Sequence, residues 1–167
     1  MNMNLNGEST KKLSTSIQKV QAALSAMGLN LQVVELPSST RTAQEAAEAI
    51  GCTVPQIMKS LVFRAKESGK PILVLASGAN RVNEKRLSEI VAEPIEKATA
   101  DFVRAKTGFV IGGVPPVAHQ ETIETYIDED LLQYEELWAA AGTPNAVFRL
   151  SSADIERMIN GRIISVR

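Results

Sequence analysis

The sequence predicts a single α/β domain, of the α+β type, built around a mixed sheet with surrounding helices. Segments with the three- and four-residue apolar spacing of helices alternate with short β-type segments, and no linker or repeat interrupts them. The length of 167 residues agrees with one domain, since about 100–200 residues is usual. We expect residues 1–12, which are polar and rich in Asn, to form a flexible tail, and residues 13–167 to form the domain.

The first third of the chain predicts three helices and one strand. Residues 13–27 carry apolar side chains at helical steps, and Gly28 after them is a natural helix stop. Residues 31–36 are typical of a short strand. A Thr-x-x-Glu capping box begins the expected helix 42–51, which a glycine ends, and a proline suits the first turn of a brief helix at 55–58.

The middle of the chain predicts a hairpin followed by two helices. Residues 61–64 and 71–76 are typical of strands, and Ser68-Gly69 between them is typical of a turn. The expected helices 83–91 and 99–108 begin at Asn and Thr, which are good N-caps because their side chains accept hydrogen bonds from free backbone amides.

The last third begins with an expected strand at 109–111 that leads into a Gly-Gly-Val-Pro-Pro loop at 112–116. Beyond it, short alternating runs and helical spacings separated by Gly, Pro and Asn continue the mixed pattern. In chain order the remaining elements are expected as strand 122–127, helix 131–141, strand 146–150, helix 151–161 and strand 163–166.

Composition excludes several classes of protein. There are 18 Lys and Arg against 19 Asp and Glu, a net charge of −1, which argues against generic polyanion binding and against a DNA-binding role. The single cysteine, Cys52, allows no internal disulfide, and with the single His119 it leaves too few ligands for structural zinc. The start lacks a signal-peptide core, and no apolar run approaches the ~20 residues of a membrane span. We therefore expect a cytoplasmic protein with no metal, cofactor or membrane partner.

Charge is distributed unevenly along the chain. Residues 59–106 hold ten basic and six acidic residues, whereas residues 121–136 hold seven acidic residues and no basic one. Two interpretations of the basic middle stay open: local contact with a phosphate backbone, or the solvated faces of ordinary helices.

Lys59 is the first candidate functional residue. If Lys59, Leu61 and Phe63 lie on one strand, the two-residue period places the ammonium beside two large apolar groups. A lysine there is costly unless it has a partner or a function. The alternative is that Lys59 lies at the frayed start of the strand and extends to water.

The loop from Gly112 to Pro116 is the second candidate. Glycines allow a ligand to approach the backbone, and two prolines stiffen the turn, so the amides near Gly113 and Val114 could be held ready for a carbonyl oxygen or oxyanion. The loop matches neither a Walker loop nor a dinucleotide fingerprint, and an ordinary tight turn is the alternative.

Cys52 and His119 are a third candidate, as a thiol nucleophile with an imidazole base. A single cysteine is more often buried packing, and a single histidine is more often a residue with a structural hydrogen bond.

From Leu36 to the C-terminus the chain resembles the YbaK/EbsC family, free-standing relatives of the editing domain inserted in bacterial prolyl-tRNA synthetases. The resemblance implies the YbaK-type editing-domain fold and a hydrolase that removes wrong amino acids from tRNA without a protein nucleophile. It is carried by five segments in family order and spacing, at Thr42–Gly51, Pro55–Phe63, Asn80–Leu87, Thr107–Pro116 and Ala146–Leu150.

The resemblance also implies a set of site residues. The lysine of the family matches Lys59 and its Gly-x-x-x-Pro loop matches Gly112 to Pro116; in related members the lysine holds the terminal nucleotide or carbonyl, and loop amides bind the scissile carbonyl. Members that remove cysteine carry a tyrosine and an aspartate where an ungapped placement puts Val33 and Val147, which favours a small aliphatic substrate such as alanine or 2-aminobutyrate. The expected catalytic residues are Lys59 and Gly112, and the expected substrate-binding residues are Gly113, Val114, Pro116, Val33, Val147 and Asn145.

The leading prediction is therefore a deacylase of mischarged aminoacyl-tRNA, with tRNA(Pro) carrying a small amino acid such as alanine as the expected substrate. Its expected partners are the tRNA acceptor end and, as a second candidate, prolyl-tRNA synthetase. Two alternatives stay open: a non-catalytic module of the same fold that binds tRNA acceptor ends or a synthetase, and a thiol-dependent hydrolase that uses Cys52.

Overall fold

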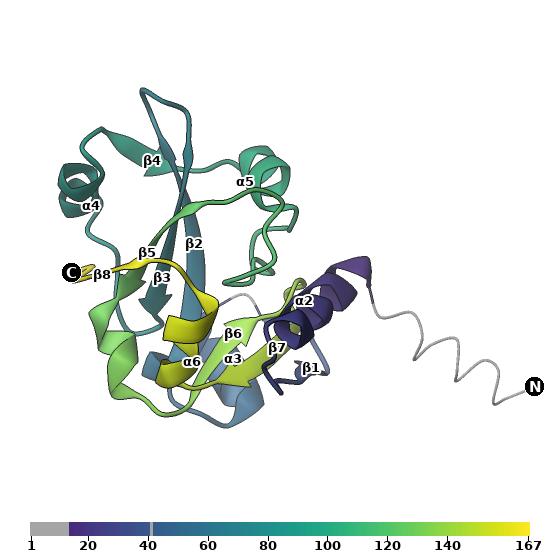
Figure 1. The fold of residues 1–167 in the computed structure, drawn as a ribbon. Coiled ribbons are helices and arrows are strands. Elements are labelled where there is room, and N and C mark those ends of the chain that lie inside the picture. The colour runs from purple at the N-terminus through teal and green to yellow at the C-terminus, as the bar shows by residue number, and fades with distance from the viewer. Residues whose placement is uncertain (1–13, 41) are drawn as a thin grey trace, which may run out of the picture.

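A computed structural model of the chain describes residues 14–40 and 42–167, so the tail expected at 1–12 lies outside the described residues. The described residues form a mixed eight-stranded sheet with helices packed around it, which confirms the predicted fold class (Figure 1). The strand order is β1-β7-β6-β2-β3-β5-β8, and β4 also pairs with β2. Among the described residues no helix is long and apolar enough to cross a membrane.

Most elements follow one another along the chain with short connections, and the long exception joins α5 to β5 through residues 108–123. The first half contains α2 (Thr15–Ala26), β1 (Val33–Glu35), α3 (Ala43–Ile50), the 3₁₀ turn η1 (Val54–Gln56), β2 (Ile57–Ala65), β3 (Pro71–Ser77) and α4 (Glu84–Val91). The second half contains β4 (Ile95–Lys97), α5 (Ala100–Thr107), β5 (Glu124–Asp128), the 3₁₀ turn η2 (Glu129–Gln133), β6 (Leu137–Ala140), β7 (Ala146–Leu150), α6 (Ser152–Met158) and β8 (Arg162–Ile164).

Helix starts and stops agree with the predicted capping residues. The side chains of Thr42, Asn83 and Thr99 each accept a hydrogen bond from a backbone amide three residues ahead. Gly51 and Gly108 end α3 and α5 in the left-handed conformation, which a glycine adopts without a side-chain clash. These local signals confirm α3, α4 and α5, and the β2–β3 hairpin is confirmed by its antiparallel pairing.

Three expectations about the elements were wrong. Residues 131–141 form no single helix: they contain the end of η2 and the strand β6, which pairs with both β2 and β7. Residues 109–111 form a loop rather than a strand. The helix expected at 55–58 is only a 3₁₀ turn at Val54–Gln56, because β2 already begins at Ile57, and the three-residue strand β4 was not predicted at all.

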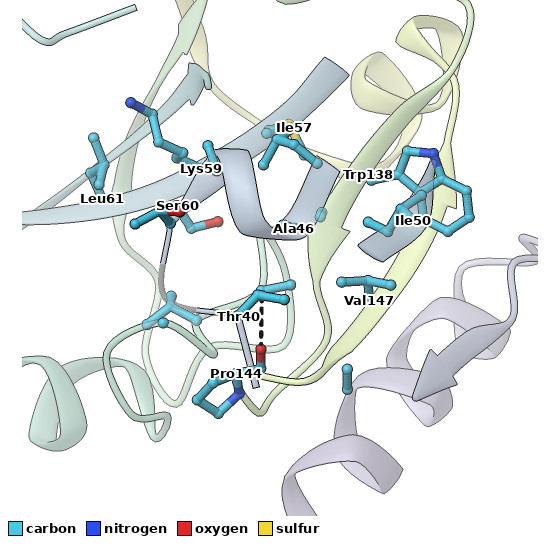
Figure 2. A pocket seen from close by; sticks show the side chains of 18 of the residues that line it. Thr40, Ala46, Ile50, Ile57, Lys59, Ser60, Leu61, Trp138, Pro144 and Val147 are labelled. Atoms are coloured by element: carbon cyan, nitrogen blue, oxygen red, sulfur yellow. Dashed lines mark hydrogen bonds between the residues drawn. The ribbon is translucent and has the colours of Figure 1, made fainter. Parts of the chain in front are cut away.

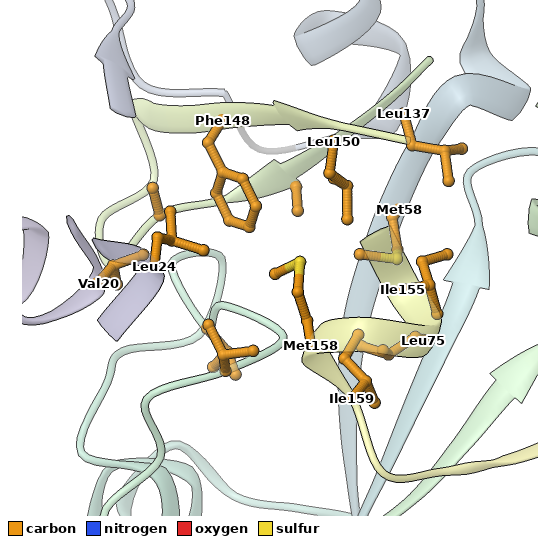
Figure 3. Packing of buried hydrophobic residues seen from close by; sticks show 14 of the residues in the cluster. Val20, Leu24, Met58, Leu75, Leu137, Phe148, Leu150, Ile155, Met158 and Ile159 are labelled. Carbon is orange, nitrogen blue, oxygen red and sulfur yellow. The ribbon is translucent and has the colours of Figure 1, made fainter. Parts of the chain in front are cut away.

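The main apolar core lies on one face of the sheet, against α2, α6 and the 109–123 loop (Figure 3). Leu24 from α2, Phe148 from β7 and Ile155 from α6 are at most 1% exposed. A second cluster, which includes Phe63 and Ile72, packs under α4 on other residues of β2 and β3. Strands β2 and β3 are therefore held firmly from both faces, which makes β2 a rigid support for side chains that it presents.

Candidate functional site

The candidate site is built on a gap in the sheet along β2. On one edge β2 pairs with β3 from Met58 to Arg64. On the other edge it pairs with β6 only at Ile57 and Met58, and with β4 only from Phe63 to Ala65. The stretch 59–62 therefore has a strand neighbour on one edge only, and the space beside it is available to a ligand.

A cavity of about 240 Å³ opens beside this gap. In Figure 2, Ile50, Trp138 and Val147 lie at one end of the cavity, and Lys59 and Ser60 lie at the other. Thr40 lies beside Pro144 in the same view, and its amide and hydroxyl both donate to the carbonyl of Pro144 at 3.1 Å. The apolar wall comes from α3, β2, β6 and β7 and consists of Ala43, Ala46, Ile50, Ile57, Trp138 and Val147.

A second cavity of about 350 Å³ adjoins the first and shares Lys59, Ser60 and Gly112 with it. Its remaining lining differs in charge, because it adds the cations Arg81 and Lys97 together with one acid, Glu84. The site thus has a small apolar compartment and a wider cationic one, with Lys59 and the glycine loop where the two meet.

Lys59 is held within β2 and does not lie at a frayed end. Its Nζ donates to the backbone carbonyl of Asn80 at 2.7 Å. Burial lowers the pKa of Lys59, an effect that the charge of Asp128 opposes and that of Arg81 adds to. Leu61 and Phe63 belong to one apolar cluster beside it, so an ammonium next to two large apolar groups is what the structure shows.

A buried carboxylate organises the segment that holds Lys59. Asp128 is 1% exposed, and its Oδ2 accepts from the amide of Ser77 at 3.0 Å and from the side chain of Asn80 at 2.8 Å. The same Asn80 side chain donates to Asp130 at 2.7 Å, and Oδ1 of Asp128 accepts from the Asp130 amide at 2.9 Å. The Asn80 side chain is therefore held by two carboxylates, which fixes the backbone carbonyl of Asn80 in position to accept from Lys59.

The glycine loop contains two amides that donate no hydrogen bond to any of the described residues. Gly112 has a φ of 87°, a conformation that favours glycine. The amide of Gly113 donates to the carbonyl of Val110, and the Gly113 carbonyl accepts from the amide of Gly142, both at 2.9 Å. Within the described residues the amides of Gly112 and Val114 have no such acceptor. Of the donors expected near Gly113 and Val114, the Gly113 amide is thus already engaged.

The structure brings some of the predicted site residues together and places others elsewhere. Lys59, Gly112, Val114 and Val147 all line the first cavity. Gly113, Pro116, Val33 and Asn145 do not line either of the two cavities.

The residues outside the cavities have visible structural contacts. The amide of Val33 donates to the side chain of Gln21 in α2 at 3.0 Å. The side chain of Asn145 accepts from Thr143 and donates to the carbonyl of Leu36, which ties the β6–β7 turn to the segment after β1.

Sequence reasoning missed several lining residues. Trp138 was assigned to a helix, because the alternating burial along Leu137–Ala140 appears only in the folded strand and the run itself is apolar throughout. Ser60 follows Lys59 directly in the sequence. Whether its backbone faces a gap in the sheet depends on which strands pair with β2, and no local sequence pattern predicts that pairing.

Cys52 and His119 have different neighbours in the fold. Cys52 packs with Ala47 and Ile57 near α3, and burial raises the pKa of its thiol. His119 bonds through Nε2 to the carbonyl of Pro115 at 2.7 Å, and burial lowers its pKa. No hydrogen bond joins the two side chains in the described structure. In residues 14–40 and 42–167, no group of three or more His, Cys, Asp and Glu is placed to hold a metal ion.

Comparison with known proteins adds four findings to this geometry. Residues 37–158 match the family model described as an aminoacyl-tRNA editing domain. The crystal structure of a candidate trans-editing enzyme for prolyl-tRNA synthetase is 47% identical, with a TM-score of 0.87, and the match covers 93% of this chain and 99% of that one.

Curated relatives point in the same direction. The candidate Cys-tRNA(Pro)/Cys-tRNA(Cys) deacylase EbsC of Enterococcus faecalis is 25% identical over 126 residues, which are 75% of this chain and 76% of EbsC. The proline–tRNA ligase of Bacillus licheniformis is 30% identical over 142 residues, which are 84% of this chain but 24% of the ligase.

Proposed function

Since the chain belongs to the aminoacyl-tRNA editing domain family (the YbaK/EbsC family), we propose that it hydrolyses the ester of mischarged tRNA. Members of this family act on aminoacyl-tRNA. The observation that carries this proposal is that Lys59 lines both the apolar and the cationic cavity together with Gly112 and Val114, whose amides have no acceptor among the described residues. Fixed amides and a cation beside an apolar pocket can bind an ester and stabilise the charge that develops on its carbonyl oxygen.

The two cavities suit the two halves of such a substrate. The first cavity, with its wall of alanine, isoleucine, valine and tryptophan side chains, suits a small aliphatic amino acid side chain. The second, with Arg81 and Lys97, suits the terminal nucleoside and its phosphate. Lys59 lies between them, next to the ester bond that joins the two halves.

The reaction is hydrolysis by water. A water oxygen attacks the carbonyl carbon, and the oxyanion that forms accepts hydrogen bonds from the Gly112 and Val114 amides. The bond from the carbonyl carbon to the ribose oxygen then breaks, and the proton released by water passes to that oxygen. The products are the free amino acid and a tRNA with an intact terminal hydroxyl, so no protein nucleophile is required.

Alanine attached to tRNA(Pro) is the substrate that we propose. The support is the apolar character of Val147 and Ile57 in a cavity of about 240 Å³. Cysteine is the competing side chain, because it is the one named for the relative EbsC. Prolyl-tRNA synthetase is the second partner that we propose, since its own sequence contains a related segment.

The test is release of amino acid from tRNA(Pro) charged with Ala, Cys, Ser or 2-aminobutyrate. We expect the wild type to release Ala fastest, and Lys59→Ala to slow that release by about 10²-fold, the effect of removing one preorganised charge-stabilising group. Lys66→Ala is the matched control, because Lys66 is exposed and lies outside both cavities. No release from any of the four substrates overturns the proposal; saturable tRNA binding without release then identifies a non-catalytic binding module.

A further inference from the structure

Ser60 carries a polar group whose lack of a partner is unusual in this protein. Its Oγ is buried, and of the buried side-chain nitrogen and oxygen atoms in the described structure it is the one without a hydrogen-bond partner. Side chains alternate along β2, so Ser60 shares a face with Met58 and Val62, which pack in or against the main core. Buried polar groups are nearly always bonded, and an exception needs an explanation.

The backbone of Ser60 also faces the gap in the sheet. The Ile57 carbonyl accepts from Gly78 and the Ala65 amide donates to Lys70, so the odd-numbered residues of β2 direct their amides and carbonyls toward β3. The even-numbered residues direct theirs to the opposite edge, as the bond from the Ala98 amide to the Val62 carbonyl shows. At Ser60 that edge has neither β6 nor β4 beside it.

Ser60 therefore offers three polar groups at one place: a buried hydroxyl, a carbonyl and an amide. It lines both cavities together with Lys59 and Gly112. A ligand at the junction of the cavities therefore lies next to a residue whose edge no strand covers.

The chemistry of the first cavity indicates which ligand group they serve. An aminoacyl ester carries a free α-ammonium, which needs hydrogen-bond acceptors. Among the described residues that line this cavity there is no Asp or Glu, and the hydroxyls of Thr40 and Thr42 already have hydrogen-bond partners within the protein. Ser60 differs from them, because its hydroxyl has no hydrogen-bond partner and its carbonyl lies at the edge of β2 that neither β6 nor β4 pairs with.

We propose that Ser60 is a substrate-binding residue that recognises the free α-ammonium group of the aminoacyl ester through its Oγ and its carbonyl oxygen. This inference rests on the proposed function and adds to it a reason why the site accepts an aminoacyl group and rejects an N-acylated one. Acylation removes the charge and two of the three donors, so an acetylated substrate leaves the hydroxyl and carbonyl of Ser60 poorly paired.

The experiment compares two non-hydrolysable ligands by calorimetry: 3′-alanylamino-3′-deoxyadenosine and its N-acetyl derivative. We expect the wild type to prefer the free amine, and Ser60→Ala to lose on the order of tenfold of that preference, as for one hydrogen bond to a charged group. Ser60→Thr, which keeps the hydroxyl, retains the preference. Ser25→Ala is the control, because Ser25 is exposed on α2.

Thermal unfolding separates substrate binding from a structural role. Because the Ser60 hydroxyl is buried without a partner, Ser60→Ala leaves the melting temperature unchanged or raises it. A lowered melting temperature, or an unchanged preference in Ser60→Ala, overturns the inference while the deacylase proposal stands. If the wild type binds neither ligand and releases no amino acid in the deacylation assay, the proposed function and this inference are both wrong.

Discussion

Replacing Asp128 by Asn is the most informative single change to the framework of the site. Oδ2 of Asp128 accepts from Ser77 and Asn80, and Oδ1 accepts from Asp130, so donors approach both carboxylate oxygens. An asparagine has one carbonyl oxygen and one NH₂ group. In either orientation its NH₂ faces at least one N–H donor at a position that is 1% exposed.

The expected cost follows from this mismatch. Leaving a buried donor without an acceptor costs about 1–3 kcal/mol, and loss of the charge weakens the hydrogen bonds that remain. We expect Asp128→Asn to lower the free energy of unfolding by about 2–3 kcal/mol. For a domain of this size that corresponds to a fall in melting temperature of about 5–10 °C.

Denaturant unfolding followed by circular dichroism measures this cost, with Glu135→Gln as the control because Glu135 is an exposed neighbour in the chain. The change has a second consequence, since the charge of Asp128 opposes the lowering of the pKa of Lys59. Its removal lowers that pKa further, so deacylation becomes more sensitive to a rise in pH. A free energy within about 0.5 kcal/mol of the wild type, the range of ordinary surface changes, would refute the reasoning.

Three further predictions concern residues that sequence reasoning singled out. Gly113→Ala places a Cβ about 2.8 Å from the Cα of Thr143, which is too close, so the backbone segments at Gly113 and Thr143 must move apart. We therefore expect a lower melting temperature and loss of deacylation, and wild-type values for both would contradict this close approach. Cys52→Ser leaves the deacylation rate unchanged, because burial raises the pKa of the thiol; a large loss of rate would instead favour the thiol-dependent hydrolase. Burial lowers the pKa of His119 below its ordinary 6.5, so the unfolded chain binds this proton more readily than the folded protein does. The neutral His119 therefore contributes its full share to the free energy of unfolding above pH 6.5. That share is lost as the pH falls from 6.5 through the lowered pKa. Unfolding midpoints from about pH 7.5 to about pH 5 should therefore fall less steeply in His119→Gln than in the wild type, and parallel profiles would contradict the prediction.

Local sequence signals were sufficient for the elements whose ends are set by their own residues. The cap of α3 needs only Thr42, an amide three residues ahead and Gly51, all within one short segment. The β2–β3 hairpin likewise closes over a few residues around Gly69, whose φ is 75°. Because the interacting groups are near neighbours in the chain, their pattern can be recognised without any knowledge of the fold.

Elements that depend on distant partners were assigned less well. Strand β6 is short, and it is a strand because Trp138 pairs with Ile57 and with Arg149. Seen alone, residues 131–141 fit a helical spacing equally well, and the pairing that decides between the two comes from other parts of the chain. Phe109 is 1% exposed in a loop, since the core and not a strand ladder holds it.

The candidate site divides in the same way. The chemical groups at Lys59 and at Gly112 could be named from the sequence, as could the family they resemble. The sequence could not predict that Val33 and Asn145 lie outside the cavity, because their positions depend on how β1 and the β6–β7 turn pack against their neighbours.

By itself, the sequence determined the fold class, the helix caps, the lysine and the stiff glycine loop, since each is a property of residue types at short spacing. Only the tertiary structure decided that β6 leaves β2 after Met58 and that β4 joins it at Phe63. That branching exposes the edge of β2 at Ser60 and creates the junction of two cavities there. The physical reason is that a backbone hydrogen-bonding group is free or paired according to which strand lies beside it, and those strands come from residues more than thirty positions away along the chain.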